Sequence, residues 1–168
     1  MFICIYFIET NDWEVAMNKK IIAIGNIVMC DDGIGVKIAE LLHYDFKLLG
    51  FETIVGETNI EYCMDKIKND DFLVVLDSSY YDIEPGTVTV TPLEQIDPDT
   101  LHFSQNTLTL LELIKLYNKK ISGFLISVEA SEIYFNPDLS EDLKVRFRDI
   151  CNQCLNYVSI INKLIAVN

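Results

Sequence analysis

Short apolar runs alternate with stretches of helical periodicity along most of the chain. Apolar runs of this length, bounded by glycine or charged residues, are typical of buried strands. They predict strands at residues 20–25, 51–55, 72–76, 87–91 and 124–128. Between these runs, apolar residues recur at spacings of three and four, which predicts helices that begin near residues 32, 60, 104 and 141.

This order of elements indicates an α/β fold. We expect a three-layer sandwich in which a mostly parallel sheet of about five strands is covered by helices on both faces, because parallel neighbours need crossover connections. At 168 residues the chain is long enough to bury one core, and residues 19–168 are predicted to form a single domain. In such sheets ligands bind at the carboxyl ends of the strands, where residues 25–32 and Asp77 are expected to lie.

Residues 1–18 do not fit this pattern and are interpreted as an N-terminal extension. Phe2 to Ile8 is apolar, but it is much shorter than the roughly 20 residues of a membrane span, and no basic residue precedes it. We therefore expect neither a signal peptide nor an anchor. Met17 stands directly before the first strand, which leads to the hypothesis that the natural product begins there.

The charge of the chain limits its partners. There are 13 Lys and Arg against 26 Asp and Glu, a net charge of -13. Such a field repels phosphate backbones, which argues against nucleic acid and anionic membranes and favours a cation or a basic peptide.

The five cysteines lack the spacing of a secreted disulfide scaffold and fit a reducing, cytoplasmic location. Cys151 and Cys154 have redox or metal spacing. They also lie on an apolar helical stripe, so we interpret them as buried thiols.

Acidic residues supply the candidate chemistry. The stretch from Gly25 to Gly35 lacks the third glycine of a dinucleotide-binding loop, and its two carboxylates would repel a phosphate. Asp31 and Asp32 therefore either cap the helix that follows or, together with Asp77, bind a divalent cation or take part in catalysis.

Histidine offers few nitrogen ligands, and no activated nucleophile is visible. His102 lies beside the predicted helix start at Ser104, where it is either a ligand or a solvated loop residue. Cys30 is next to Asp31, whose charge would raise the thiol pKa, so a cysteine protease is not expected.

The loop after the first predicted strand resembles the opening of the hydrogenase maturation proteases. The pattern that carries the resemblance is Gly25-Asn26, four residues, and then Asp31-Asp32-Gly33-Ile34-Gly35-Val36. The likeness extends through residues 72–77, 84–86, 103–104 and 127–129, and it covers nearly everything from Lys19 onward. It implies a twisted sheet between helices. It also implies an endopeptidase that removes a carboxy-terminal peptide from the large subunit of [NiFe] hydrogenases after nickel insertion.

The resemblance also implies the site residues. Asp32 and Asp77 would contact nickel, and the third position, a histidine in the family, is Asn106 in this chain. Asparagine oxygen is a weaker nickel ligand than imidazole nitrogen, so either His102 supplies the nitrogen or metal recognition is weakened. The supporting loop would comprise Gly25, Asn26, Asp31, Gly33 and Gly35.

The expected function is thus that of a nickel-dependent endopeptidase, with nickel carried by its substrate, a hydrogenase large-subunit precursor. Asp32 or Asp77 could orient the attacking water, or the ion could polarise the scissile carbonyl. Two alternatives remain open. One is a non-catalytic module that binds a metal or a partner, and the other is a peptidase of this fold with a different protein substrate.

Overall fold

The chain is described by a computed structural model that covers residues 17–97, 99 and 102–167. Residues 1–16 of the predicted extension, residues 1–18, lie outside this description, and so does the segment that the hypothesis of a start at Met17 would remove. The elements follow one another as β1 (Lys19–Ile24), η1 (Cys30–Gly33), α1 (Ile34–Leu48), β2 (Phe51–Glu57), α2 (Ile60–Lys66), β3 (Asp71–Ser79), β4 (Val88–Pro92), η2 (Leu93–Gln95), α3 (Gln105–Leu116), β5 (Ile121–Glu129) and α4 (Glu141–Ile165).

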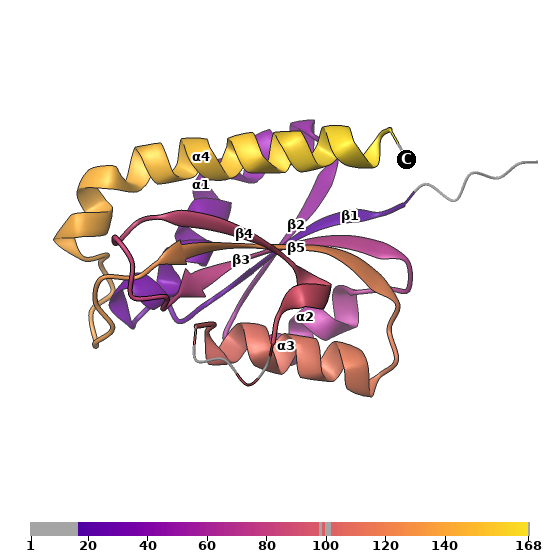
Figure 1. Cartoon of the computed structure of the whole chain (residues 1–168), viewed down its shortest axis with the longest axis horizontal. Helices are drawn as coiled ribbons and strands as arrows, with labels where there is room; N and C mark the ends of the chain where they lie inside the picture. The colour runs from indigo at the N-terminus through magenta and orange to yellow at the C-terminus, as the bar shows by residue number, and fades with distance from the viewer. Residues whose placement is uncertain (1–16, 98, 100–101, 168) are drawn as a thin grey trace, which may run out of the picture.

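The five strands form one sheet in the order β2-β1-β3-β5-β4 (Figure 1). The pairs β1–β2, β1–β3 and β3–β5 are parallel, whereas β4 pairs antiparallel with β5. The turn at Glu84-Pro85-Gly86 leads into this antiparallel edge strand, and Gly86 has a positive φ of 77°. The predicted α/β class with a mostly parallel sheet is confirmed.

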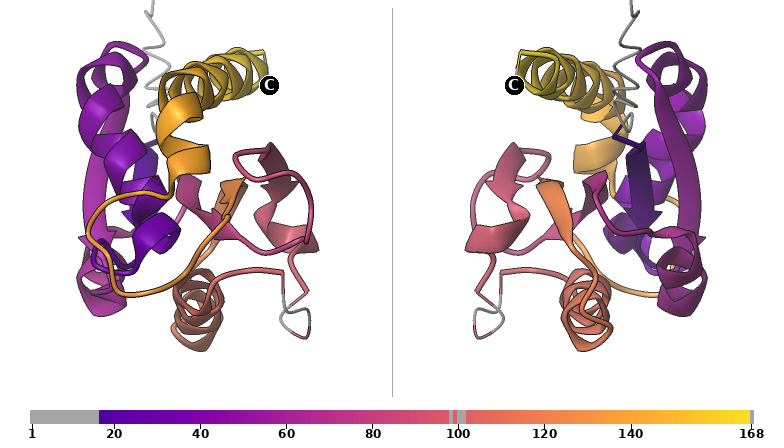
Figure 2. Two further views of the ribbon diagram at one scale, coloured as in Figure 1. Left: turned by 90° about the vertical axis from the view of Figure 1, so that its left-hand side faces the viewer. Right: turned by 90° about the vertical axis from the view of Figure 1, so that its right-hand side faces the viewer.

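Helices cover both faces of the sheet, as the sequence predicts. The buried residues of α1 and α4 pack against one face in one hydrophobic cluster, and those of α2 and α3 pack against the other face in a second cluster. Figure 2 shows α4 and α3 on opposite sides of the strands. Because both faces are covered, the central strand β3 is buried at every position.

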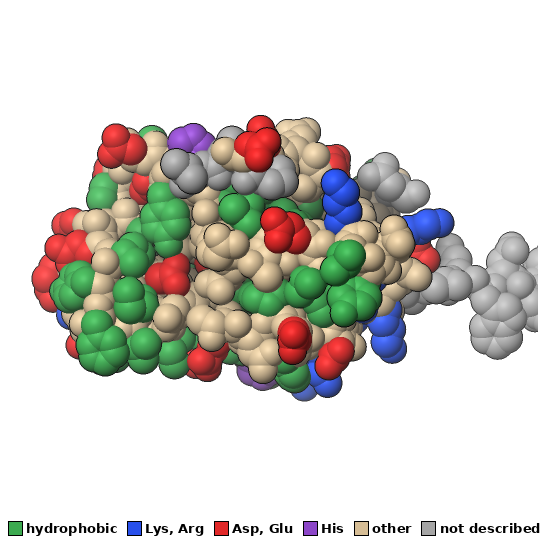
Figure 3. All heavy atoms as spheres, turned by 90° about the horizontal axis from the view of Figure 1, so that it is seen from below, with side chains coloured by type: hydrophobic (Ala, Val, Ile, Leu, Met, Phe, Trp, Pro, Cys, Tyr) green, Lys and Arg blue, Asp and Glu red, His purple; other side chains and the backbone are tan. Residues whose placement is uncertain are grey.

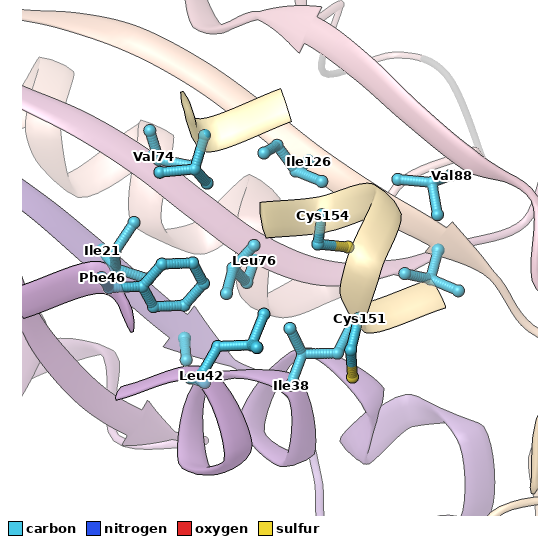
Figure 4. Packing of buried hydrophobic residues seen from close by; sticks show 14 of the residues in the cluster. Ile21, Ile38, Leu42, Phe46, Val74, Leu76, Val88, Ile126, Cys151 and Cys154 are labelled. Carbon is cyan, nitrogen blue, oxygen red and sulfur yellow. The ribbon is translucent and has the colours of Figure 1, made fainter. Parts of the chain in front are cut away.

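The cysteines of α4 belong to the first cluster. Cys151 and Cys154 are buried and free, and Figure 4 shows their side chains among the apolar residues of α1 and β3. Burial raises the pKa of Cys151 to about 11 and that of Cys154 to about 12. The interpretation of these two residues as packed thiols is therefore confirmed.

The order of the strands creates a switch point. From β1 the chain passes through α1 to β2 on one side, and β2 then connects through α2 to β3 on the other side of β1. Because α1 and α2 lie on opposite faces, the carboxyl ends of β1 and β3 open between them, which is where ligands bind in folds of this class. None of the helices among the described residues has the length and apolar run that crossing a bilayer requires.

Candidate active site

Asp77 lies near the end of β3 and is fully buried. Its Oδ1 accepts a hydrogen bond from the backbone N of Ser78 at 2.8 Å. Its Oδ2 accepts hydrogen bonds from Thr107 Oγ1 at 2.6 Å and from Ser104 Oγ. Burial raises the pKa of Asp77 to about 7 even though these hydrogen bonds lower it, and the nearby charge of Asp32 raises it further. The carboxyl group can therefore hold a proton near neutral pH.

Asp32 lies in η1, in the loop that leaves β1, and is half-buried. Its Oδ2 accepts a hydrogen bond from the backbone N of Asn26 at 2.9 Å. Its Oδ1 accepts one from Ser78 Oγ at 2.9 Å and one from Tyr80 Oη at 2.7 Å. Burial, together with the neighbouring Asp32, raises the pKa of the Tyr80 phenol well above its usual range, so the phenol remains a donor.

Ser78 joins the two carboxyl groups. Successive strand residues point to opposite faces of a sheet, so Asp77 faces α3 whereas Ser78 faces α1. The backbone N of Ser78 binds Asp77 and its hydroxyl binds Asp32. The two acids thus lie at the switch point on the two faces of the sheet, and Ser78 is hydrogen-bonded to both.

Close packing fixes the loop that carries Asp32. Gly25 has a φ of 129°, and a Cβ there would overlap the backbone oxygen of Asp32. Gly35 brings α1 against β3, because a Cβ at this position would overlap the backbone oxygen of Leu76, next to Asp77. Gly33 is similarly confined, with Ile27 Cα only 2.9 Å from the position of a Cβ. The predicted loop residues therefore set the relative position of β1, α1 and β3.

Asp31 has a different partner from the one expected. Neither aspartate caps α1, whose N-cap is Gly33 without a side-chain hydrogen bond, because a turn of 3-10 helix precedes it. Fully buried Asp31 instead accepts hydrogen bonds from the backbone N of Ser131 (2.9 Å), Glu132 (3.0 Å) and Ser140 (2.8 Å). The capping prediction is wrong, and Asp31 ties the loop after β5 to the loop after β1.

Asn106 and His102 lie at the start of α3. Asn106 is half-buried in the first turn, between Ser104 and Thr107, the two residues that bind Asp77. His102 is exposed, stacks on the ring of Tyr81 and places Nδ1 3.2 Å from the backbone O of Tyr80. When Nδ1 carries the proton and donates to this carbonyl, Nε2 is left with the free electron pair that a metal requires.

The donor set near these carboxylates does not make a complete resident metal centre. Within residues 17–97, 99 and 102–167, no group of three His, Cys, Asp or Glu side chains could hold an ion. Asp32 is half-buried, with hydroxyl groups bound to its Oδ1, whereas Asp77 is fully buried and its Oδ2 is covered by two hydroxyl groups.

Sequence reasoning did not find the contribution of Tyr80, Ser78 or Thr107. Extending the predicted strand to Ser79 and applying its period of two would have placed Ser78 and Tyr80 on the face of Asp32. No comparable local signal marks Thr107, because its partner lies 30 residues away in the chain.

No protein-family model matches the chain. It is 34% identical over 77 residues to the hydrogenase expression/formation protein HupD of Rhizobium leguminosarum bv. viciae, which covers 45% of this chain and 38% of HupD. It is 25% identical over 154 residues to the hydrogenase expression/formation protein HoxM of Azotobacter vinelandii, which covers 86% of this chain and 73% of HoxM. The matched part of HupD is thus well under half of that protein's length.

Solved structures give a longer match. The [NiFe] hydrogenase maturation protease HybD from Thermococcus kodakarensis superposes with a TM-score of 0.70 at 20% identity, covering 87% of this chain and 99% of HybD. At this identity the likeness shows the fold. The resemblance indicated by the sequence motifs is therefore confirmed: this chain is similar in sequence to hydrogenase expression/formation proteins and has the fold of the [NiFe] hydrogenase maturation proteases.

Proposed function

We propose that this chain is an endopeptidase that removes the carboxy-terminal peptide from the large-subunit precursor of a [NiFe] hydrogenase. The observation that carries the proposal is the pair Asp32 and Asp77, joined through Ser78 at the switch point of this fold. The similarity to HupD over 45% of the chain, to HoxM over 86% of it, and to HybD in fold supports the choice of substrate.

Nickel enters this proposal as part of the substrate. Carboxylate oxygens bind divalent ions, and Asp32 is the member of the pair that is only half-buried, so an ion held by the precursor would meet it first. Asp77 contacts the ion only after Ser104 and Thr107 release its Oδ2. Asn106 and the Nε2 atom of His102 are the further ligands proposed at the start of α3.

The chemical roles follow from the same contacts. A carboxyl group whose pKa is near neutrality can accept a proton from water and return it to a leaving amine, which is the requirement for a general acid–base. Asp77 has such a pKa because it is buried, and it would reach the water once Ser104 and Thr107 release its Oδ2. Asp32, held by Asn26, Ser78 and Tyr80, is positioned to orient the ion or the attacking water.

The direct test is processing of a purified, nickel-loaded large-subunit precursor, followed by intact mass. We expect loss of one carboxy-terminal peptide with the wild type, and loss of about 100-fold or more in rate with Asp32→Asn. Asp65→Asn, at an exposed position of α2, is the matched control and should cleave normally. The proposal fails if the wild type leaves the loaded precursor intact while HybD cleaves its own precursor in parallel.

A second candidate is a module of this fold that binds a metal or a partner without cleaving it. The specific observation in its favour is Asn106, an amide where the family has a histidine, next to an Asp77 whose Oδ2 is covered. Asn106→His separates the two candidates. A gain of cleavage from an inactive wild type would show that the native site binds without catalysis, whereas an active wild type would exclude this candidate.

A further inference from the structure

Four exposed apolar side chains lie at the end of the molecule that carries Asp32. Val28 is 40% exposed, Ile133 43%, Tyr134 49% and Phe135 78%. We call these residues the apolar rim. Figure 3 shows hydrophobic side chains with acidic ones among them at the left-hand end, the end at which Figure 1 places the loop between β5 and α4.

The rim is built on two loops that are hydrogen-bonded to each other. Asn136 N donates to Val28 O at 2.9 Å, and Cys30 N donates to Asn136 O at 2.7 Å. Asp31 adds its bonds to the start of the same loop. These side chains are therefore presented by fixed backbone, and a partner that binds them bears little cost for ordering the loops.

Acidic side chains flank the rim in the loop between β5 and α4. Glu132 and Asp138 are exposed, and neither takes part in an ion pair among the residues that the structure describes. Two cations lie near this loop: Lys144 is paired with Glu141, and Lys37 donates to the backbone O of Pro137 at 2.9 Å. Two exposed acids against one lysine without an ion pair leave the border of the rim acidic. An apolar patch with unpaired acids at its border is complementary to an apolar segment with basic residues beside it.

The rim is continuous with the candidate active site. Val28 and Asp32 belong to the same loop, and Asp32 N donates to the backbone O of Met29 at 3.2 Å. A chain segment bound on the rim therefore lies within a few residues of the loop position that carries the carboxylate proposed to meet the ion.

We propose that the apolar rim is the docking surface for the hydrogenase precursor, which binds it through an apolar segment flanked by Lys or Arg. This inference rests on the proposed function, because the precursor is the occupant. It adds to that function the side chains that select the substrate protein, separate from those that act on its peptide bond.

The test compares Phe135→Ser with Leu116→Ser. Leu116 is 71% exposed at the end of α3, so the two variants remove similarly exposed apolar side chains from different surfaces. Binding is measured with nickel-free precursor, which the proposed function leaves uncut. We expect Kd to rise about tenfold to a hundredfold for Phe135→Ser and to stay at the wild-type value for Leu116→Ser.

A charge test uses the acids at the border. The double change Glu132→Lys and Asp138→Lys should weaken binding at low salt and reduce the salt dependence of Kd, because it removes the attraction to basic residues. Unfolding in urea is compared for every variant, since all of these side chains are exposed and their replacement should leave stability nearly unchanged.

The outcomes separate this inference from the proposed function. If the wild type binds the precursor, Phe135→Ser does not, and the loaded precursor is not cleaved, the docking surface is supported and the endopeptidase proposal is contradicted. Cleavage with equal Kd for Phe135→Ser and Leu116→Ser overturns the docking surface alone. Absence of measurable binding by the wild type, or self-association through the rim in sedimentation, also overturns it.

Discussion

The stability of this protein should fall as pH rises, because of one buried acid. Burial raises the pKa of Asp77 from its usual 3.8 to about 7. Between these two values the folded protein keeps a proton that the unfolded chain has lost, so raising the pH favours unfolding. A shift of about three pKa units corresponds to about 4 kcal/mol, fully expressed only above about pH 7.

The perturbation that isolates this effect is Asp77→Asn, which keeps the shape of the side chain and removes its titration. The free energy of unfolding is measured in urea by far-UV circular dichroism for both proteins between about pH 5 and about pH 8. The wild type should lose about 2 to 3 kcal/mol relative to the variant from about pH 5 to about pH 7, and little more above that. Asp65→Asn should show no such trend.

A difference between wild type and Asp77→Asn that stays constant across this range would refute the reasoning. It would mean that the hydrogen bonds from Ser104, Thr107 and Ser78 stabilise the ionised carboxylate enough to offset its burial. A difference that grows in favour of the wild type as pH rises would have the same meaning.

Three further predictions concern the frame around the site. Gly35→Ala should destabilise the fold by about 1–3 kcal/mol in urea, despite the better helix propensity of alanine, because its Cβ would separate α1 from β3. Asp31→Asn should speed amide exchange in the loop after β5 and cost about 1–3 kcal/mol, because a buried acceptor of three backbone amides is weakened; unchanged exchange would contradict this. In a Cys4→Ser background, DTNB should leave Cys151 and Cys154 unmodified in the native state and react with four thiols in guanidinium; fast native reaction of either residue would contradict their burial.

The elements of this fold could be predicted from sequence because each rests on a local pattern. The apolar run at residues 72–76 predicts a buried strand, and β3 is buried throughout. The helix starts predicted near residues 104 and 141 agree with the caps Ser104 and Ser140, whose Oγ atoms accept hydrogen bonds from Thr107 N and Leu143 N.

The partners within the site could not be predicted in the same way. Asp31 has the spacing of a helix cap. The backbone amides that donate to its carboxylate nevertheless lie about 100 residues further along the chain, as Ser131 N does. Such a contact depends on which loops meet at the edge of the sheet, which a local pattern does not contain. The burial of Asp77 likewise depends on α3 packing across the end of β3.

Ser78 restricts which substitutions this chain can tolerate. Its amide and its hydroxyl serve different acids on different faces, so proline, glycine, alanine and every apolar side chain would each disconnect at least one of them. Threonine alone also carries its hydroxyl group on Cβ, where it can reach the same acceptor, but at a position with no free surface it must also place an additional methyl group. In a saturation library selected for function, position 78 should therefore be as intolerant as the acids themselves, although it carries no charge.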